Sequence, residues 1–255
     1  MKIRIFDSRE ECLVAGAWAF IRYALNNPEG TIGLCTGSTT GPIHEMVADI
    51  YRKYPFDVSR LHTVNADEFL TPKGSPVTLT MRTTMKKDLF DALGIDEERG
   101  MLPDSTAEDG DAEALKYEER IKAVGGVGLQ MLGVGPDAHL GFCLAGTSFD
   151  SVCHKRAVSP AIEEIIVNKY KFDRSMGPFY GITMGLKTFM QGKEMLPIVC
   201  GASKAEAAEK AIFGPVTEEV PASILQLHPN CTWYMDREAA AGIIGRVNPD
   251  GTPMK

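Results

Sequence analysis

Two adjacent acids, Asp67 and Glu68, come just after a strand-like run at residues 61–65 of this 255-residue chain. A carboxylate that is held in place and partly removed from water can act as a general base, even toward a proton on carbon. A helix cap or a solvated turn would use the same residue types, so the pair alone leaves these alternatives open. The pair is therefore a candidate source of one general base.

A histidine with a nearby aspartate follows an apolar run at residues 127–132. The segment reads GVGPDAHLGF, with Asp137 two residues before His139. An aspartate at this spacing can hold one imidazole nitrogen, which fixes the tautomer and raises the basicity of the other nitrogen. Such an acid–base pair suits the opening of a sugar ring. A lone histidine is often structural, but the glycine frame and the nearby acid favour a catalytic role.

Two turns rich in small polar residues indicate an anion site. Residues 35–42 read CTGSTTGP, so Thr36, Gly37, Ser38 and Thr39 lie between an apolar run and a helix whose first amides can bind phosphate. The segment is neither a Walker A motif nor GxGxxG. Lys204 follows another apolar run, and a lysine near a helix N-terminus is unfavourable unless an anion is shared. A plain strand-to-helix turn and a solvated lysine are the alternatives.

Alternating strands and helices must position these groups. Strand-like runs occupy residues 3–6, 31–35, 61–65, 127–132, 155–158, 180–184, 196–200 and 231–235; helices are expected at 8–26, 41–54, 80–93, 112–123, 186–191, 203–212 and 237–244. This alternation predicts an α/β fold with a mostly parallel sheet. Ligands of such sheets bind beyond the carboxyl ends of the strands, which is where the candidate residues fall.

The composition indicates one globular domain. The chain is 44% hydrophobic and 24% charged, and no linker divides it, so we expect one domain over residues 1–244 and a loose tail at 245–255. Two domains are the less favoured alternative at this length. The net charge of −7 argues against binding to nucleic acid or to an anionic membrane surface, because both need clustered positive charge.

Cysteine usage and the apolar runs predict a cytoplasmic protein. The six cysteines show no CxxC spacing, which argues against a zinc site and a disulfide framework. The first residues lack the apolar core of a signal peptide, and no run is long enough to span a membrane. Reduced thiols in a reducing compartment fit this pattern.

The strand-end segments together resemble the glucosamine-6-phosphate deaminase (isomerase) family, which is related to the 6-phosphogluconolactonases. The resemblance covers nearly the whole chain and is carried by LCTGSTTGP, VNADEF, LGVGPDAHLGF, GITMGL, GASKAEA and LQLHP. It implies a Rossmann-like α/β fold with helices on both faces of the sheet, without a metal or another cofactor. It also implies a sugar-phosphate ligand and aldose–ketose isomerisation of a hexosamine phosphate coupled to ammonia release.

The resemblance assigns roles residue by residue. Asp67 matches the base that moves a proton between C2 and C1, His139 matches the ring-opening acid–base group, and Asp137 matches its orienting partner. The phosphate cradle is matched by Thr36, Gly37, Ser38, Thr39 and Lys204.

Leu144 is the main departure from the family pattern. Deaminases of this family continue after the histidine turn with Asn-Glu-Pro, and the glutamate assists the histidine; this chain has Leu144 in its place. A leucine cannot accept a hydrogen bond, so the relay is shortened to Asp137 and His139. The family's later arginine is also missing, and Asn168 or Lys169 lies nearby in sequence.

Three functions follow from these residues. The first is a deaminase-like sugar-phosphate isomerase, with or without ammonia release. The second is a 6-phosphogluconolactonase, because those enzymes also keep Asp-x-His and carry an apolar residue at the position of Leu144. The third is a sugar-phosphate sensor without turnover. Association into a homo-oligomer stays open.

Overall fold

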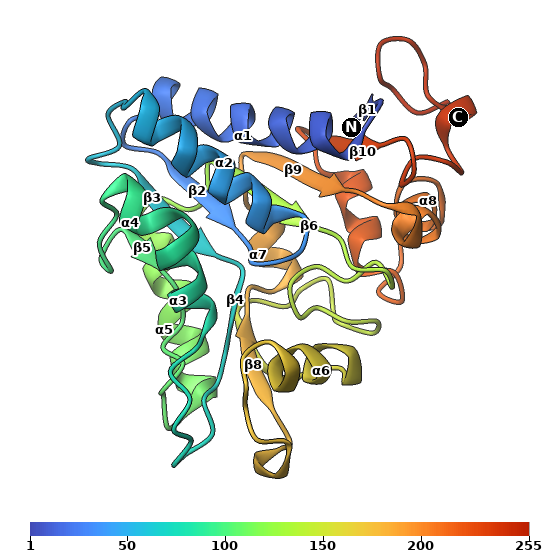
Figure 1. The fold of residues 1–255 in the computed structure, drawn as a ribbon. Coiled ribbons are helices and arrows are strands. Elements are labelled where there is room, and N and C mark those ends of the chain that lie inside the picture. Colours follow the sequence, from blue (N-terminus) through green and yellow to red (C-terminus); the bar gives the residue numbers. More distant parts are fainter. Residues whose placement is uncertain (255) are drawn as a thin grey trace.

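A seven-stranded parallel sheet forms the centre of the protein in the computed structural model, which describes residues 1–254 (Figure 1). In spatial order the strands are β1 (Lys2–Phe6), β10 (Thr232–Asp236), β9 (Glu194–Val199), β6 (Leu129–Gly133), β2 (Thr31–Leu34), β3 (His62–Asn65) and β5 (Gly100–Met101). Each neighbouring pair in this sheet runs parallel. The predicted α/β fold with a mostly parallel sheet is confirmed.

Helices cover both faces of this sheet. They are α1 (Arg9–Asn26), α2 (Thr40–Lys53), α3 (Met81–Met85), a π-helical segment (Lys86–Phe90), α4 (Asp91–Leu93), α5 (Gly110–Ala123), α6 (Pro160–Asn168), α7 (Leu186–Met190) and α8 (Ala205–Phe213). Short 3-10 turns occupy Arg174–Met176, Ala202–Lys204, Pro221–Leu227 and Ile244–Arg246. One apolar core contains side chains from α1, α2 and α3, and the other contains side chains from α5, α7 and α8.

The side chains of strand β9 pack into both cores. Met195 and Val199 pack on the side of α5, α7 and α8, whereas Leu196 and Ile198 pack on the side of α1 and α2. Successive side chains of a strand point to opposite faces, so a continuous apolar run is what a strand buried on both faces requires.

A smaller antiparallel sheet lies beside the carboxyl ends of the main strands. Its order is β4 (Asp67–Phe69), β8 (Tyr180–Thr183) and β7 (His154–Ala157). In Figure 1, β4 and β8 run away from the parallel sheet toward α6. The sequence predicted β7 and β8 as strands but not this separate sheet, because the partner β4 is only three residues long and follows β3 almost directly.

Helix α1 begins where the sequence predicted. The Ser8 hydroxyl accepts a hydrogen bond from the Glu11 amide at 3.1 Å, which satisfies one of the unpaired donors of the first turn. The Glu11 carboxylate reaches back to the Asp7 amide at 3.1 Å, one residue earlier than in the usual reciprocal cap.

One prediction near the C-terminus is wrong: the sequence predicts a helix at residues 237–244, but these residues form turns that lead into the 3-10 turn Ile244–Arg246. The loose tail predicted at residues 245–255 stays a prediction, and its last residue lies outside the described residues. Within residues 245–254, the Gly251 carbonyl accepts a hydrogen bond from the Ile3 amide at 2.7 Å, and a bridge joins Val247 to Pro253.

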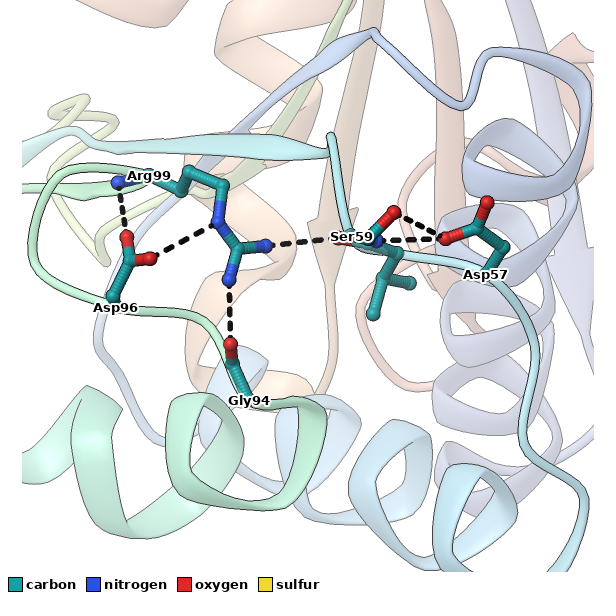
Figure 2. A network of polar contacts seen from close by, with 6 residues as sticks. Asp57, Ser59, Gly94, Asp96 and Arg99 are labelled. Atoms are coloured by element: carbon teal, nitrogen blue, oxygen red, sulfur yellow. Dashed lines mark hydrogen bonds and ion pairs between the residues drawn. The ribbon is translucent and has the colours of Figure 1, made fainter.

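At the opposite edge, Arg99 fastens the loop before β5 to the loop before β3 (Figure 2). Its guanidinium donates to the carbonyls of Val58 at 2.9 Å and Gly94 at 2.5 Å, and its amide donates to the Asp96 carboxylate at 2.9 Å. Nearby, the Asp57 carboxylate accepts two hydrogen bonds from Ser59. This network closes the β5 edge of the sheet.

Among residues 1–254, no helix has the length and apolar character needed to cross a membrane. Within the same residues there is no group of three or more His, Cys, Asp or Glu side chains that could hold a metal ion. The six cysteines are buried thiols.

Candidate active site

One cavity of about 740 Å³ brings all eight predicted site residues together. They are Thr36, Gly37, Ser38, Thr39, Asp67, Asp137, His139 and Lys204. The cavity lies beyond the carboxyl ends of β2, β3, β6 and β9, where a parallel sheet places its ligands. A second cavity, of about 830 Å³ between β1, β10 and the C-terminal segment, contains none of these residues.

The predicted phosphate loop and Lys204 meet in space. The Lys204 ammonium donates to Oγ1 of Thr39 at 3.3 Å. Thr39 precedes the first turn of α2, and its side chain makes no capping hydrogen bond to the α2 amides. In this first turn the Gly41 amide donates to the Gly37 carbonyl and Pro42 has no amide hydrogen. The positive end of the α2 dipole and the Lys204 ammonium still lie together, as an anion site requires.

Two further hydrogen bonds hold the segment from Cys35 to Thr39 in place. The Arg9 guanidinium donates to the Ser38 carbonyl at 2.6 Å, and the Gly133 amide at the end of β6 donates to the Cys35 thiol at 3.2 Å. On the other side, the Gly201 amide donates to both oxygens of Asp236, at 3.1 and 2.9 Å, which holds the turn that carries Lys204. Burial lowers the pKa of Lys204, because desolvation penalises the ammonium form.

His139 is held by Asp137 as the spacing predicted. The distance from Nδ1 of His139 to Oδ1 of Asp137 is 2.5 Å, and this hydrogen bond lowers the pKa of Asp137. The arrangement leaves Nε2 as the nitrogen for proton transfer. Gly135 makes room for the ring: a Cβ on this residue would lie 2.2 Å from Cε1 of His139.

Asp67 reaches the same cavity from the small sheet. It pairs with Thr183 of β8, is 4% exposed, and its Oδ1 has no hydrogen-bond partner in the described structure. Gly141, with φ of 56°, passes close by, and a Cβ there would lie 3.2 Å from Oδ2 of Asp67 and 2.7 Å from Oγ1 of Thr183. The histidine loop and the β4–β8 sheet therefore pack directly against each other at this glycine.

The two adjacent acids have separate tasks, since neighbouring residues of a strand face opposite ways. Burial, with the charge of Glu68 as a smaller cause, raises the pKa of Asp67 to about 8. Glu68 accepts hydrogen bonds from the amides of Phe69, Met81 and Arg82 at 2.8, 3.0 and 2.8 Å. Burial raises the pKa of Glu68 to about 7, against the effect of these hydrogen bonds. Glu68 thus caps the start of α3, and Asp67 alone faces the cavity.

The sequence pattern predicted no helix for one wall of the cavity, although Asn168 and Lys169, which lie near the position of the missing arginine, belong to it. Helix α6 lines it with Ile162, Ile165 and Asn168, and Lys169 and Tyr170 follow. Ser159 and Pro160 could have indicated the start of this helix. The Ser159 hydroxyl accepts a hydrogen bond from the Ile162 amide at 3.3 Å, and the proline occupies the first turn. Nothing in the sequence pattern pointed to Tyr170.

Leu144 is half-buried and does not line the cavity. The carboxylates that do line it are Asp67, Asp137 and Glu164, and Glu164 is engaged by Arg174 at 2.7 Å. Glu68 was the nearest candidate in sequence to replace the missing glutamate, but its two oxygens are occupied by α3 amides. Among the described residues, therefore, no free third carboxylate lies beside the Asp137–His139 pair.

Comparison with known proteins shows the family of this chain. Residues 14–233 match the model of the family described as glucosamine-6-phosphate isomerases/6-phosphogluconolactonase. The chain belongs to this family. A glucosamine-6-phosphate deaminase from Clostridium botulinum (strain Kyoto / Type A2) is 32% identical over 244 residues, which cover 94% of this chain and 98% of the relative. One from Halalkalibacterium halodurans is 35% identical over 240 residues, with 94% and 96% covered.

Solved structures of the family have the same fold. A monomeric glucosamine-6-phosphate deaminase superposes with a TM-score of 0.86 at 29% identity, covering 94% of this chain and 99% of that one. A 6-phosphogluconolactonase from Trypanosoma brucei superposes with a TM-score of 0.73 at 17% identity, covering 95% and 98%. The second likeness shows a shared fold. The predicted Rossmann-like architecture is confirmed.

Proposed function

We propose that this family member is a deaminase-like enzyme that isomerises a hexose or hexosamine 6-phosphate by moving a proton between C2 and C1. The observation that supports this most directly is the convergence of Asp67, the Asp137–His139 pair and the loop with Lys204 on one cavity. The identity of 32–35% with glucosamine-6-phosphate deaminases over nearly the whole chain supports the same substrate class. The six free, buried thiols fit a reaction in the reducing cytoplasm.

In the proposed reaction, the loop and Lys204 hold the phosphate. His139 takes the proton of the C1 hydroxyl and returns it to the ring oxygen, which opens the ring. Asp67 then removes the proton from C2, giving an enolamine, and delivers a proton to C1. The resulting imine at C2 adds water and loses ammonia, which leaves the ketose phosphate.

The ionisation of Asp67 sets the pH at which this base works. Only the carboxylate can accept the C2 proton, and the raised pKa of about 8 makes the protonated form dominant at neutral pH in the free site. We therefore expect kcat/KM for isomerisation to rise as the pH increases toward 8. An ammonium group on the substrate would favour the carboxylate when it binds close to Asp67.

A 6-phosphogluconolactonase is the second candidate. Leu144 and the absence of a free third carboxylate in the described cavity favour it, because hydrolysis of a lactone needs His139 to activate water and needs no proton removal from C2. Asp67→Asn separates the two candidates. It should abolish ketose formation in an isomerase and leave acid release intact in a lactonase.

The deciding experiment is a panel of amino-sugar, keto-sugar and lactone 6-phosphates. Ammonia release, ketose formation and acid release are scored separately. Isomerase activity predicts ketose formation, and a lactonase predicts acid release alone. A sensor, the third candidate, would bind at least one of these compounds and give none of the three products.

A further inference from the structure

Three aromatic rings form a continuous wall of the active-site cavity. Phe69 stacks on Phe142 with ring centroids 5.6 Å apart and meets Tyr170 edge-on at 5.0 Å. All three line the cavity and are otherwise buried. They come from β4, from the loop after His139 and from the end of α6, so only the tertiary structure assembles the wall, which we call the aromatic wall.

The aromatic wall stands next to the reacting groups. Phe69 is two residues after Asp67, so both side chains leave the same face of β4. Phe142 follows Gly141, which packs against Asp67 and Thr183. A sugar placed between Asp67 and His139 would therefore lay one face on aromatic rings. Apolar C–H faces of sugars gain by burial against such surfaces, whereas their hydroxyls stay directed at polar groups.

Tyr170 connects this wall to the phosphate loop. Tyr170 lines the same cavity as Thr36, and Thr36 is the first residue of the predicted cradle. The Lys169 ammonium lies 5.3 Å from the centroid of the Tyr170 ring. Burial raises the pKa of Tyr170, so the hydroxyl keeps its proton at neutral pH and remains a donor.

We propose that Tyr170 is a substrate-binding residue with two contacts: its hydroxyl donates to the phosphate held by the Thr36–Thr39 loop, and its ring supports the aromatic wall on which the C–H face of the sugar packs. This rests on the proposed sugar-phosphate function. The substrate class that follows is a phosphosugar that enters with its phosphate toward Thr36 and one apolar face toward Phe69 and Phe142.

The cavity offers few positive charges to a phosphate, so a neutral donor such as the Tyr170 hydroxyl becomes important. The cavity is lined by two lysines, and of these Lys169 is exposed at the rim whereas Lys204 is partly buried against Thr39. A phosphate carries more negative charge than one buried ammonium neutralises, so further donors must satisfy its oxygens. A protonated phenol in the same cavity as Thr36 meets this need without adding a second buried cation.

Tyr170→Phe tests the hydroxyl alone, because it keeps the ring and its packing. Binding of glucosamine 6-phosphate and of glucosamine is measured by calorimetry on the full chain, and KM and kcat are measured for whichever reaction the panel reveals. We expect affinity for the phosphorylated sugar to fall by roughly 10-fold or more, the usual loss for a hydrogen bond to a charged group. Binding of glucosamine should not change, and KM should rise while kcat stays near its original value.

Phe142→Leu tests the ring contact independently. This variant should bind glucosamine 6-phosphate and glucosamine more weakly by the same factor, because stacking of the sugar on the ring does not depend on the phosphate. Tyr180→Phe is the matched control: Tyr180 is a partly exposed tyrosine at the start of β8 and lies outside the cavity lining. Thermal unfolding of each variant checks that the fold is retained.

The possible results separate the two proposals. Unchanged affinity of Tyr170→Phe for glucosamine 6-phosphate, with clear binding by the unaltered protein, overturns the role of Tyr170 and leaves the proposed function standing. An equal loss for the sugar with and without phosphate also overturns the hydroxyl contact. If the unaltered protein binds no sugar phosphate from the panel, both proposals are wrong.

Discussion

The ammonium of Lys204 donates to Oγ1 of Thr39 at 3.3 Å although 165 residues separate the two along the chain. The contact joins the turn after β9 to the turn after β2, and these two strands flank β6 in the sheet. Parallel strands place their carboxyl ends at one edge, so turns that are remote in sequence become opposite walls of one site. Asp67 and His139 reach the same cavity by the same principle.

We predict that Lys204→Ala weakens sugar-phosphate binding by about 1.5–3 kcal/mol, the range for a charge-assisted hydrogen bond. Calorimetry with glucosamine 6-phosphate measures the loss. Lys210→Ala is the control, because Lys210 belongs to α8 but pairs with Glu206 on the surface. Equal affinities of Lys204→Ala and the unaltered protein would remove Lys204 from the phosphate site.

Asp67→Asn should stabilise the fold at alkaline pH while it abolishes isomerisation. The folded pKa of about 8 lies above the ordinary value of 3.8, so the protonated form is favoured by folding. The stability contributed by this group is present at low pH and is lost as the pH rises from about 4 to about 8. The asparagine side chain carries no charge to bury, and we expect the variant to gain about 1–3 kcal/mol at pH 8.

Urea unfolding of both proteins at pH 5 and pH 8 measures this difference. The gain of Asp67→Asn should be larger at pH 8 than at pH 5. A variant that is less stable than the unaltered protein at pH 8 would contradict the raised pKa of Asp67.

Gly135→Ala should reduce turnover by displacing His139. The added Cβ would lie 2.2 Å from the imidazole, so the ring must move away from the position that Asp137 now holds. A misplaced acid–base group costs on the order of 10²-fold or more in kcat. Gly245→Ala serves as the control, since a Cβ there meets no atom within 4 Å. Full activity of Gly135→Ala would show that the ring position is not critical.

Ammonia release from glucosamine 6-phosphate should be slow, because no free third carboxylate lies beside the Asp137–His139 pair among the described residues, and Leu144 stands where the family has a glutamate. Lost assistance to an acid–base group typically costs on the order of 10²–10⁴ in rate. Leu144→Glu should raise ammonia release, and Leu144→Gln, with the same size but no charge, should not. Rapid deamination by the unaltered protein would contradict the role assigned to Leu144.

Leu144 is half-buried, and a glutamate that fails to reach His139 would leave a buried charge that costs stability. Thermal unfolding of Leu144→Glu and Leu144→Gln is therefore measured alongside the rates. A stable Leu144→Glu variant with unchanged ammonia release would favour the lactonase, because a lactonase should not gain ammonia release from this substitution.

The sequence by itself determined the parallel sheet, the place of the Thr36–Thr39 turn after a strand and the contact between Asp137 and His139. Each depends on local order: apolar runs define strands buried on both faces, and an aspartate two residues from a histidine can reach its ring. The whole-chain order of loosely defined motifs also sufficed to identify the family. The C-terminal segment shows the limit of this reasoning, because its pairing with β1 depends on a strand almost the whole chain away.

Only the tertiary structure decided which of two adjacent acids faces the cavity and which other residues line it. Asp67 and Glu68 are equivalent by composition, and the pairing of β4 with β8 turns one toward the cavity and the other toward the amides of α3. Tyr170 follows α6 in a stretch of sequence without a recognisable motif, and it lines the cavity only because the fold places the end of α6 there. Long-range strand pairing decides which face of a strand points into the cavity and which side chains surround an aromatic ring. A sequence pattern that repeats every two residues carries no information about which partner strand is chosen.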